Sequence, residues 1–337
     1  MDRAPAAERV MHPAPPRPTP PLRPRRRTTA WVAGLLLAAP AVLTACRLLD
    51  TDAVTPVPQL LSFLPWFAAP AALGLLLAAV ARRRVLAALA VVVLAATVWT
   101  VLPYGPDHTT ARGPVVARLR VLASNVEFSG ATGSLITAVR RERPQLVFVS
   151  ECDRACGHAL TRAFAAELPH YASVEEDGSA GSVILSAYPL RDWHMIPATM
   201  GMPGATAEIG GRTVRLQLAH PMPPLPGQVH LWKRELGRVR DATAPDGPQI
   251  VAGDFNASQD HAAFRAVLDG GGLHDAARLS GASRTPSWPM DGPLPPFVQI
   301  DHVLVTDDFT VRGTRFLDLA GTDHRALLAD LDLHAGR

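Results

Sequence analysis

The chain has 337 residues, of which 48% are hydrophobic, and its formal net charge is +3. Residues 1–118 contain 13 of the 33 basic residues and 5 of the 30 acidic ones, which leaves 20 basic and 25 acidic residues for the rest of the chain. Proteins that grip nucleic acid without sequence specificity usually present a basic surface, because their affinity comes from neutralising phosphates. The composition therefore argues against general nucleic-acid binding by residues 119–337.

The N-terminal third predicts a membrane anchor. Residues 1–29 are rich in proline and arginine without hydrophobic periodicity, which is typical of a disordered basic tail. Three uncharged apolar runs follow at about 28–46, 57–80 and 85–104, and each is near the roughly 20 residues that cross a bilayer. We therefore expect three transmembrane helices within residues 30–104. A cleaved signal peptide is the rival interpretation of the first run, but two more runs follow it.

Arginine clusters predict the orientation of this anchor. One cluster lies at 23–27 and a second at 82–84, whereas the loop between the first two runs is acidic apart from Arg47. Short loops that are rich in Arg and Lys stay in the cytoplasm. The N-terminus should then be cytoplasmic, and everything after the third run should lie outside a bacterial plasma membrane. The runs contain no acidic or basic side chain that would mark a transport pathway, so we interpret them as an anchor.

The rest of the chain predicts a linker and one folded domain. Residues 105–117 contain Gly and Pro breaks that favour a linker, and 118–337 has the size of an ordinary domain. Short β-branched runs predict strands at 118–126, 146–151, 182–190, 213–220, 249–256, 300–306 and 326–333, with helices at 134–143, 158–168 and 230–239. Several of these strands are apolar on both faces, which indicates a layered α/β (α+β) sandwich with covered sheets.

Polar side chains stand where these predicted strands begin or end. They are Asn125, Glu151, His220, Asp254, Asn256, Asp301, Asp323 and His324. Residues two apart on a strand face the same way, so Asp254 and Asn256 should point into one space. Gly253 beside them would let the backbone approach a ligand closely. We therefore expect a single site at one edge of the sheets.

Seven short segments in this part of the chain carry a resemblance to a known family. They are ASNV, FVSE, SVILSAYPL, LAHP, GDFN, IDHVLV and TDH, and they occur in this order across 118–337. Together they resemble the endonuclease/exonuclease/phosphatase superfamily, which includes deoxyribonucleases, inositol polyphosphate phosphatases and neutral sphingomyelinases. The resemblance implies a four-layer αββα sandwich, here preceded by three transmembrane helices.

The resemblance also implies a cation site. Glu151 would bind Mg²⁺, or Mn²⁺ in its place, and Asn125 and Asp323 would complete the shell of the metal. Hard divalent cations prefer oxygen ligands and keep several waters, so few protein carboxylates suffice. Without the resemblance, Glu151 could equally be a solvated acid after a strand, and Asn125 a turn amide.

The remaining residues acquire catalytic roles by the same resemblance. Asp254 would orient or deprotonate the attacking water, and Asn256 would position water and phosphate, with Asn125 also contacting phosphate. Asp301 would orient His324, which would act as general acid or general base. His220 would bind the scissile phosphate or protonate the leaving group. Deoxyribonucleases supply a carboxylate partner to this histidine, whereas this chain has Ala180 and Gly181 at the corresponding place, so its protonation role is open.

Two cysteines next to the predicted metal ligand allow two interpretations. Cys152 and Cys156 follow Glu151 in ECDRAC. In an outward-facing domain a disulfide is expected. Zinc binding is disfavoured because two further ligands are not evident.

The predicted reaction is hydrolysis of a phosphate ester or anhydride at the outer membrane face. The anchor and motifs together also resemble a membrane-bound actinobacterial branch linked to teicoplanin resistance, which implies an envelope lipid (pyro)phosphate as substrate. The predicted partners are therefore the bilayer and a lipid-linked phosphate. The alternatives are an extracellular nuclease, a phosphodiesterase similar to phospholipase C or sphingomyelinase, and an inactive membrane-tethered binding protein.

Overall fold

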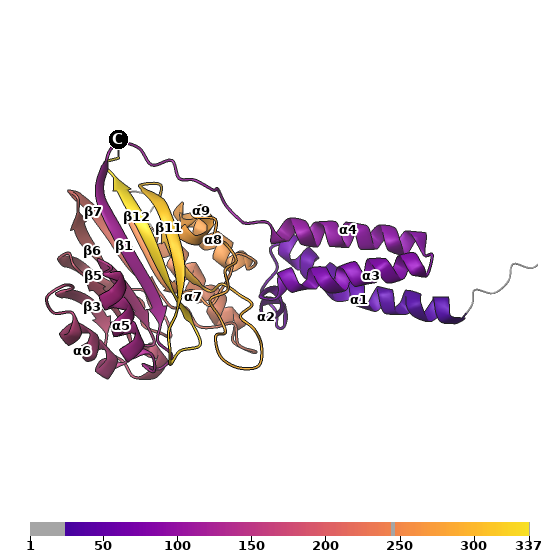
Figure 1. Cartoon of the computed structure of the whole chain (residues 1–337), viewed down its shortest axis with the longest axis horizontal. Coiled ribbons are helices and arrows are strands. Elements are labelled where there is room, and N and C mark those ends of the chain that lie inside the picture. The colour runs from indigo at the N-terminus through magenta and orange to yellow at the C-terminus, as the bar shows by residue number, and fades with distance from the viewer. Residues whose placement is uncertain (1–23, 244–246, 337) are drawn as a thin grey trace, which may run out of the picture.

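A computed structural model describes residues 24–243 and 247–336, which form a helical bundle joined to a sheet domain (Figure 1). Most of the predicted tail, residues 1–23, lies outside the described residues. The prediction for its last residues is wrong, because the first helix already begins at Pro24.

The bundle contains four α-helices and one short 3-10 helix. They are α1 (Pro24–Leu48), α2 (Val57–Leu61), η1 (Leu64–Phe67), α3 (Ala68–Val80) and α4 (Arg84–Val101). Helices α1, α3 and α4 pack through the buried residues Leu37, Ala71 and Ala90. Gly74 allows α3 to approach α1 closely, since a Cβ there would lie 2.8 Å from Leu37.

Two of these helices are long and apolar enough to cross a membrane, Arg26–Leu48 and Arg84–Val101. The middle run does not form a third such helix within the described residues, because its longest apolar helical segment is Leu64–Val80. α2, η1 and α3 each carry a proline in the first turn, namely Pro58, Pro65 and Pro70, and proline lacks the N–H that would continue a preceding helix. By length and apolar composition, two of the three expected helices are therefore present among the described residues.

The sheet domain contains two six-stranded sheets. The first has the order β11-β12-β1-β2-β4-β3 and the second β5-β6-β7-β8-β10-β9. The strands of the first sheet are β1 (Val115–Asn125), β2 (Leu146–Ser150), β3 (His170–Val174), β4 (Ser182–Ser186), β11 (Phe309–Asp318) and β12 (Arg325–His334). Those of the second are β5 (Leu190–Met195), β6 (Pro203–Ile209), β7 (Arg212–Ala219), β8 (Gln249–Asp254), β9 (His274–Asp275) and β10 (Asp301–Val305).

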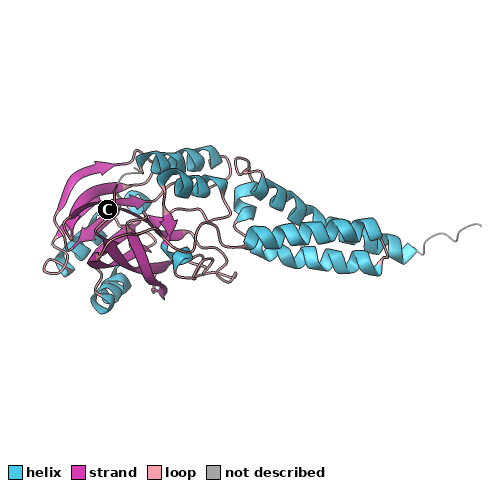
Figure 2. Cartoon of the chain, turned by 90° about the horizontal axis from the view of Figure 1, so that it is seen from above, coloured by secondary structure: helices cyan, strands magenta, loops and turns pink. Residues whose placement is uncertain are grey.

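Helices cover the outer face of each sheet (Figure 2). They are α5 (Thr132–Glu142) and α6 (Arg154–Ala163) on the first sheet, and α7 (Val229–Ala242) and α8 (Ala262–Gly271) on the second. The short elements η2 (Gly178–Ala180) and α9 (Ala276–Leu279) lie in loops. Between the sheets, residues such as Phe148 and Leu216 form one apolar core. This arrangement confirms the predicted αββα sandwich.

Strand direction explains why polar residues gather at one edge. β1 runs parallel to β2, and β7 runs parallel to β8, so the carboxyl ends of each pair meet. β10 runs antiparallel to β8 with Asp301 opposite Asp254, and β12 runs antiparallel to β1. The beginnings of β10 and β12 therefore lie beside the ends of their neighbours.

The bundle docks on the sheet domain through a buried polar interface. Asp52 is fully buried, and its carboxylate accepts from Lys233 Nζ at 2.8 Å and from the backbone N–H of Ala263 at 2.9 Å. That N–H belongs to the first turn of α8, where a negative charge is favourable. On the other side of the interface, Arg284 donates to the carbonyl of Val101 at the end of α4.

His261 makes this interface sensitive to pH. Its Nδ1 accepts from the Ser258 N–H at 2.9 Å, so its Nε2–H donates to the Pro58 carbonyl at 2.8 Å. Burial lowers the pKa of His261 below its ordinary 6.5. Since the unfolded state binds the proton more readily, the stability contributed by neutral His261 is present above pH 6.5 and is lost as the pH falls toward its folded pKa.

We expect the thermal unfolding temperature to fall between pH 7.5 and pH 5.5, and to fall less in His261→Asn, which cannot be protonated. The two proteins would be compared by differential scanning calorimetry in the same detergent. An equal decrease in both would contradict this role for His261.

Candidate active site

Three of the predicted residues form a buried acid–imidazole cluster. His324 Nδ1 donates to Asp301 Oδ2 at 2.9 Å, and His324 Nε2 lies 3.7 Å from Asp254 Oδ2. Asp254, Asp301 and His324 are all buried, and each offers a ligand atom within 4.8 Å of the others. Asp301 therefore fixes the ring of His324 so that Nε2 faces Asp254.

Asn125 and Glu151 extend this cluster onto the first sheet. Asn125 Nδ2 donates to Glu151 Oε1 at 3.0 Å and to Asp254 Oδ2 at 3.1 Å. Asn125 Oδ1 accepts from the Glu127 N–H, and Glu151 Oε2 accepts from the Phe128 N–H. Asn125 thus presents its amide nitrogen to the carboxylates. In this orientation it bridges them and its oxygen faces the Glu127 N–H, and the ligand role of Asn125 stays a prediction.

His220 completes the same space from the second sheet. Its Nε2 lies 3.8 Å from Glu151 Oε1 and 3.9 Å from Asp254 Oδ2. Its Nδ1 is buried without a hydrogen-bond partner in the described structure. The absence of a carboxylate at Ala180 and Gly181 is therefore not compensated by another residue at Nδ1.

Asn256 and Asp323 lie at the margin of the cluster. Asn256 donates its N–H to Asp254 Oδ1 at 2.8 Å and its Nδ2–H to the Pro221 carbonyl at 3.0 Å. Asp323 Oδ1 lies 3.6 Å from His324 Nε2, and Asp323 Oδ2 accepts from Trp288 Nε1 at 2.7 Å. The structure thus brings all eight predicted side chains to one sheet edge, although their chemical roles stay predictions.

The pKa values of the two histidines at this edge are shifted in opposite directions. Burial, together with the positive charge of His324, lowers the pKa of His220 to about 3. Burial also disfavours charge on His324, but the carboxylates of Asp301 and Asp254 outweigh it and raise the pKa of His324 to about 10. Burial raises the pKa of Asp254, although His324 opposes this shift. The shifts favour the neutral form of His220 and the protonated form of His324.

The charge balance of the edge fits a bound cation. Among the described residues, no Lys or Arg forms an ion pair with Glu151, Asp254 or Asp301, and buried carboxylates without such partners are unfavourable. Asp301 Oδ1 is buried and has no hydrogen-bond partner. Because these donors are oxygens, they suit a hard divalent cation. Glu151 and Asp254 face the same space across Asn125 and would hold it.

The structure gives Gly253 a different role from the expected one. A Cβ there would lie 2.2 Å from the Ala219 carbonyl oxygen, so the glycine admits strand β7 and not a ligand. His302, next to Asp301 on β10, faces away from the site, since it packs against Phe264 and hydrogen-bonds to Asp275.

Supporting residues were missed by sequence reasoning because they have no motif. Ser287 Oγ accepts from the Asp301 N–H at 3.1 Å, and Trp288 holds Asp323. Several non-glycine residues around the edge have left-handed backbone, among them Glu127, Glu151 and Asn256. Such conformations are costly and cluster at functional sites. No sequence signal marks them.

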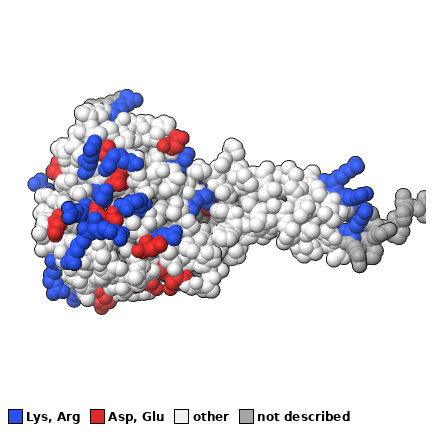
Figure 3. Space-filling model, viewed as in Figure 1, with Lys and Arg blue, Asp and Glu red and all other residues white. Residues whose placement is uncertain are grey.

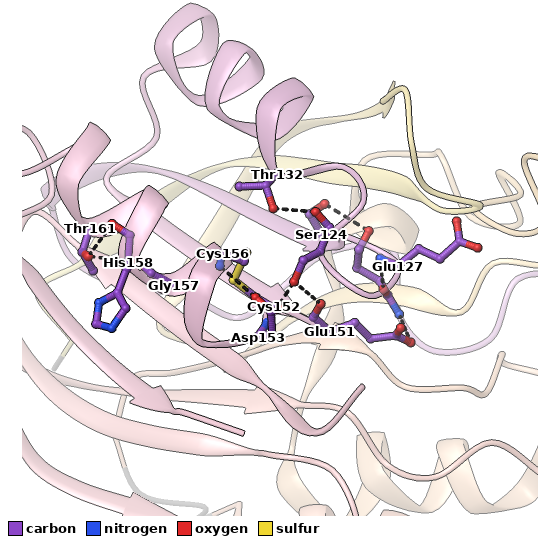
Figure 4. The surroundings of a disulfide bond; sticks show 12 residues. Ser124, Glu127, Thr132, Glu151, Cys152, Asp153, Cys156, Gly157, His158 and Thr161 are labelled. Atoms are coloured by element: carbon purple, nitrogen blue, oxygen red, sulfur yellow. Dashed lines mark hydrogen bonds between the residues drawn. A yellow bond between two sulfur atoms is a disulfide. The ribbon is translucent and has the colours of Figure 1, made fainter. Parts of the chain in front are cut away.

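A disulfide joins Cys156 to Cys152, the residue that follows Glu151 in the chain (Figure 4). The Cys152 N–H also donates to the Gly181 carbonyl at 3.0 Å, and Asp153 Oδ1 caps helix α6 by accepting from the Cys156 N–H. Of the two interpretations of these cysteines, the structure has the disulfide, and it ties the segment after Glu151 to α6.

Comparison with known families decides the membership of this domain. Residues 122–324, more than half of the chain, match the Endonuclease/Exonuclease/phosphatase family. The chain belongs to this family. Its members, as the name states, cleave phosphate esters in nucleic acids and in other phosphorylated compounds. The chain is accordingly a hydrolase of the phosphoester-cleaving type.

Solved structures agree with this fold. An Endonuclease/Exonuclease/phosphatase protein from Beutenbergia cavernae has a TM-score of 0.53 at 20% identity, over 65% of this chain and 72% of its own. TDP2 from D. rerio, complexed with a single-strand DNA product, has a TM-score of 0.52 at 16% identity. The match covers 64% of this chain and 99% of the TDP2 chain. At these identities the likeness concerns the fold alone. No curated protein sequence matches the chain significantly.

Proposed function

We propose that this member of the Endonuclease/Exonuclease/phosphatase family is a membrane-anchored, magnesium-dependent phosphoesterase that hydrolyses a lipid-linked phosphate ester or anhydride. The observation that carries the proposal is the buried pairing of Asp301 with His324, directly beside Asp254 and the Asn125-bridged Glu151. Imidazole, carboxylate and amide groups converge there from both sheets, and such groups can supply the acid–base, orienting and phosphate-binding functions of phosphoester hydrolysis.

The residues around the site have distinct tasks in this proposal. A bound Mg²⁺ would polarise the phosphoryl oxygen and stabilise its developing negative charge. Asp254 orients the attacking water, and Asn256 and Asn125 contact the phosphate. The raised pKa of His324 favours its protonated form, so we assign it as the donor to a phosphoryl or leaving oxygen, and His220, whose pKa is lowered, binds the phosphate in its neutral form. Mn²⁺ is the alternative cation, because it prefers the same oxygen ligands.

The bundle supports the membrane part of the proposal. Its two long helices have 23 and 18 residues, which at 1.5 Å per residue is about 35 and 27 Å. Their apolar windows are only 28% and 17% buried, whereas the core helix of a soluble protein is mostly buried. Large apolar side chains such as Trp31 and Trp99 are exposed, and lipid would cover them.

The charge distribution supports the orientation. Figure 3 shows a bundle surface without charge over most of its length and basic side chains at the end far from the sheet domain. These include the exposed residues Arg82, Arg83 and Arg84. A cytoplasmic position for this end follows from the positive-inside bias, and the catalytic domain is then extracytoplasmic.

A lipid-linked substrate is favoured by the position of the site relative to the bundle. Phe297, in a loop before Asp301, stacks on Phe63 of the bundle with ring centroids 3.9 Å apart. The site therefore lies close to the bundle end from which a headgroup would emerge. A tethered enzyme meets such substrates at high effective concentration.

The proposal is tested by measuring the cleavage products of matched substrates in proteoliposomes with Mg²⁺. The product is inorganic phosphate from the pyrophosphate lipid, a phosphorylated headgroup from phospholipid or sphingomyelin, and nucleotides or shorter fragments from DNA. An undecaprenyl pyrophosphate-type lipid, a phospholipid, sphingomyelin and DNA would each be supplied to the full chain. We expect hydrolysis of the isoprenoid pyrophosphate to be fastest. Preferential cleavage of phospholipid or sphingomyelin would instead indicate a phospholipase C-like activity. Preferential cleavage of DNA would indicate a nuclease. Hydrolysis of none would favour a binding protein.

A further inference from the structure

The segment that joins α1 to α3, residues 49–67, is here called the connector. It touches the catalytic domain at a loop, residues 287–298, that ends just before Asp301. Backbone hydrogen bonds between Trp288 and Val298 close this loop, including the Trp288 N–H to the Val298 carbonyl at 3.1 Å. The loop is therefore a folded unit. A displacement of the part that touches the connector would also move the part next to Asp301.

Three consecutive contacts lead from the connector to the site. Phe63 stacks on Phe297 at an interplanar angle of 17°. Phe297 meets Trp288 edge to face with centroids 5.5 Å apart. Trp288 Nε1 then donates to Asp323 Oδ2 at 2.7 Å. Aromatic pairs of these geometries are attractive beyond their buried area, and the last bond is charge-assisted.

The same loop holds the backbone on both sides of His324. The Met290 N–H donates to the Asp323 carbonyl at 2.7 Å, and the Arg325 N–H donates to the Ser287 carbonyl at 2.8 Å. Ser287 Oγ also accepts from the Asp301 N–H. Both members of the Asp301–His324 pair are therefore fixed by one loop, and that loop rests on Phe63.

We propose that the connector is a positioning element of the active site: Phe63 holds Phe297, Phe297 holds Trp288, and Trp288 sets the Asp323 carboxylate beside His324. This inference rests on the proposed function for its catalytic consequence. The bundle then serves as more than an anchor, because a catalytic domain without its connector loses the support of this loop. Groups that hold a metal ligand in place typically contribute about 10–100-fold to metal affinity or activity, and Asp323 is a predicted ligand.

The test compares Phe63→Ala, Phe63→Tyr, Trp288→Phe and the double variant Phe63→Ala/Trp288→Phe in the full chain in detergent. Activity is measured with Mg²⁺ on bis(p-nitrophenyl) phosphate, a soluble diester that needs no membrane. We expect Phe63→Ala to lower kcat by about 10-fold or more with little change in KM. Phe63→Tyr keeps the stacked ring and should retain activity. The double variant should be no slower than Trp288→Phe alone, because both changes interrupt one chain of contacts.

Lys233→Met provides a matched control. It removes a different contact between the connector and the catalytic domain, the ion pair of Asp52 with Lys233, which lies on α7 and not in the 287–298 loop. We expect this variant to keep its kcat. A loss of kcat as large as that in Phe63→Ala, or effects of Phe63→Ala and Trp288→Phe that multiply in the double variant, would overturn the proposal.

Hydrogen exchange separates this inference from the proposed function. Phe63→Ala should increase amide exchange in 287–298 and 320–326, whereas Lys233→Met should leave both segments protected. If the wild type hydrolyses no substrate, but Phe63→Ala increases exchange in both segments and Lys233→Met does not, the phosphoesterase proposal fails and the positioning role stands. Unchanged exchange in both segments of Phe63→Ala would reject the positioning role even in an active enzyme.

Discussion

Replacing His324 with alanine is expected to lower kcat for phosphoester hydrolysis by about 10²–10⁴-fold, the usual contribution of a positioned general acid or base. His324 Nε2 is the only imidazole nitrogen in the described structure within 4 Å of both Asp254 and Asp323 carboxylate oxygens. The loss should appear in kcat more than in KM, because proton donation acts in the transition state. Steady-state kinetics on the preferred substrate would measure it.

His230→Ala is the matched control, since His230 is an exposed histidine on α7. We expect it to behave as the wild type. Asp301→Asn should resemble His324→Ala, and the two changes should not add, because Asp301 acts by orienting the imidazole. Retention of most of the activity in His324→Ala would exclude the proposed role of this histidine.

Replacing Glu151 with glutamine is expected to weaken Mg²⁺ activation by at least about 100-fold, since even indirect partners of a metal contribute about 10–100-fold. The substitution keeps the shape of the side chain and its contact with the Phe128 N–H, but it removes the negative charge. The concentration of Mg²⁺ for half-maximal activity should rise, and kcat should fall at saturating Mg²⁺. Titration of activity with Mg²⁺ in chelator-treated protein would measure both.

Glu176→Gln removes the charge of an exposed glutamate and controls for net charge. Its Mg²⁺ dependence should equal that of the wild type. Full activity of the wild type in excess chelator, or an unchanged Mg²⁺ dependence in Glu151→Gln, would contradict a cation site at Glu151.

The sequence predicted the catalytic sandwich well because its central strands are buried on both faces. β2, β4 and β8 are continuous apolar runs that end in a polar residue, and this pattern is readable without a structure. Edge strands were missed for the opposite reason. β5 has five exposed residues out of six, and β11 mixes polar and apolar residues without alternation, so neither carries a strand pattern.

The sequence predicted the residues of the site but not the residues that hold them in place. Strand ends indicated where Asp254 and His324 lie, because parallel and antiparallel neighbours bring those ends together. The orientation of the Asn125 amide depends on the Glu127 N–H, which lies in an irregular turn. The contact of Trp288 with Asp323 joins residues with a sequence separation of 35, through a loop that has no periodicity. Such contacts follow from tertiary packing and leave no local pattern.

The central claim is that side chains from both sheets form one cation-dependent phosphoesterase site. Anomalous scattering from crystals of the full chain soaked with Mn²⁺ and inorganic phosphate tests it most directly. We expect an Mn²⁺ peak in contact with Glu151 and Asp254 and a phosphate within hydrogen-bond reach of His324 and His220. An ordered Mn²⁺ ion bound elsewhere, with this edge empty, would contradict the account.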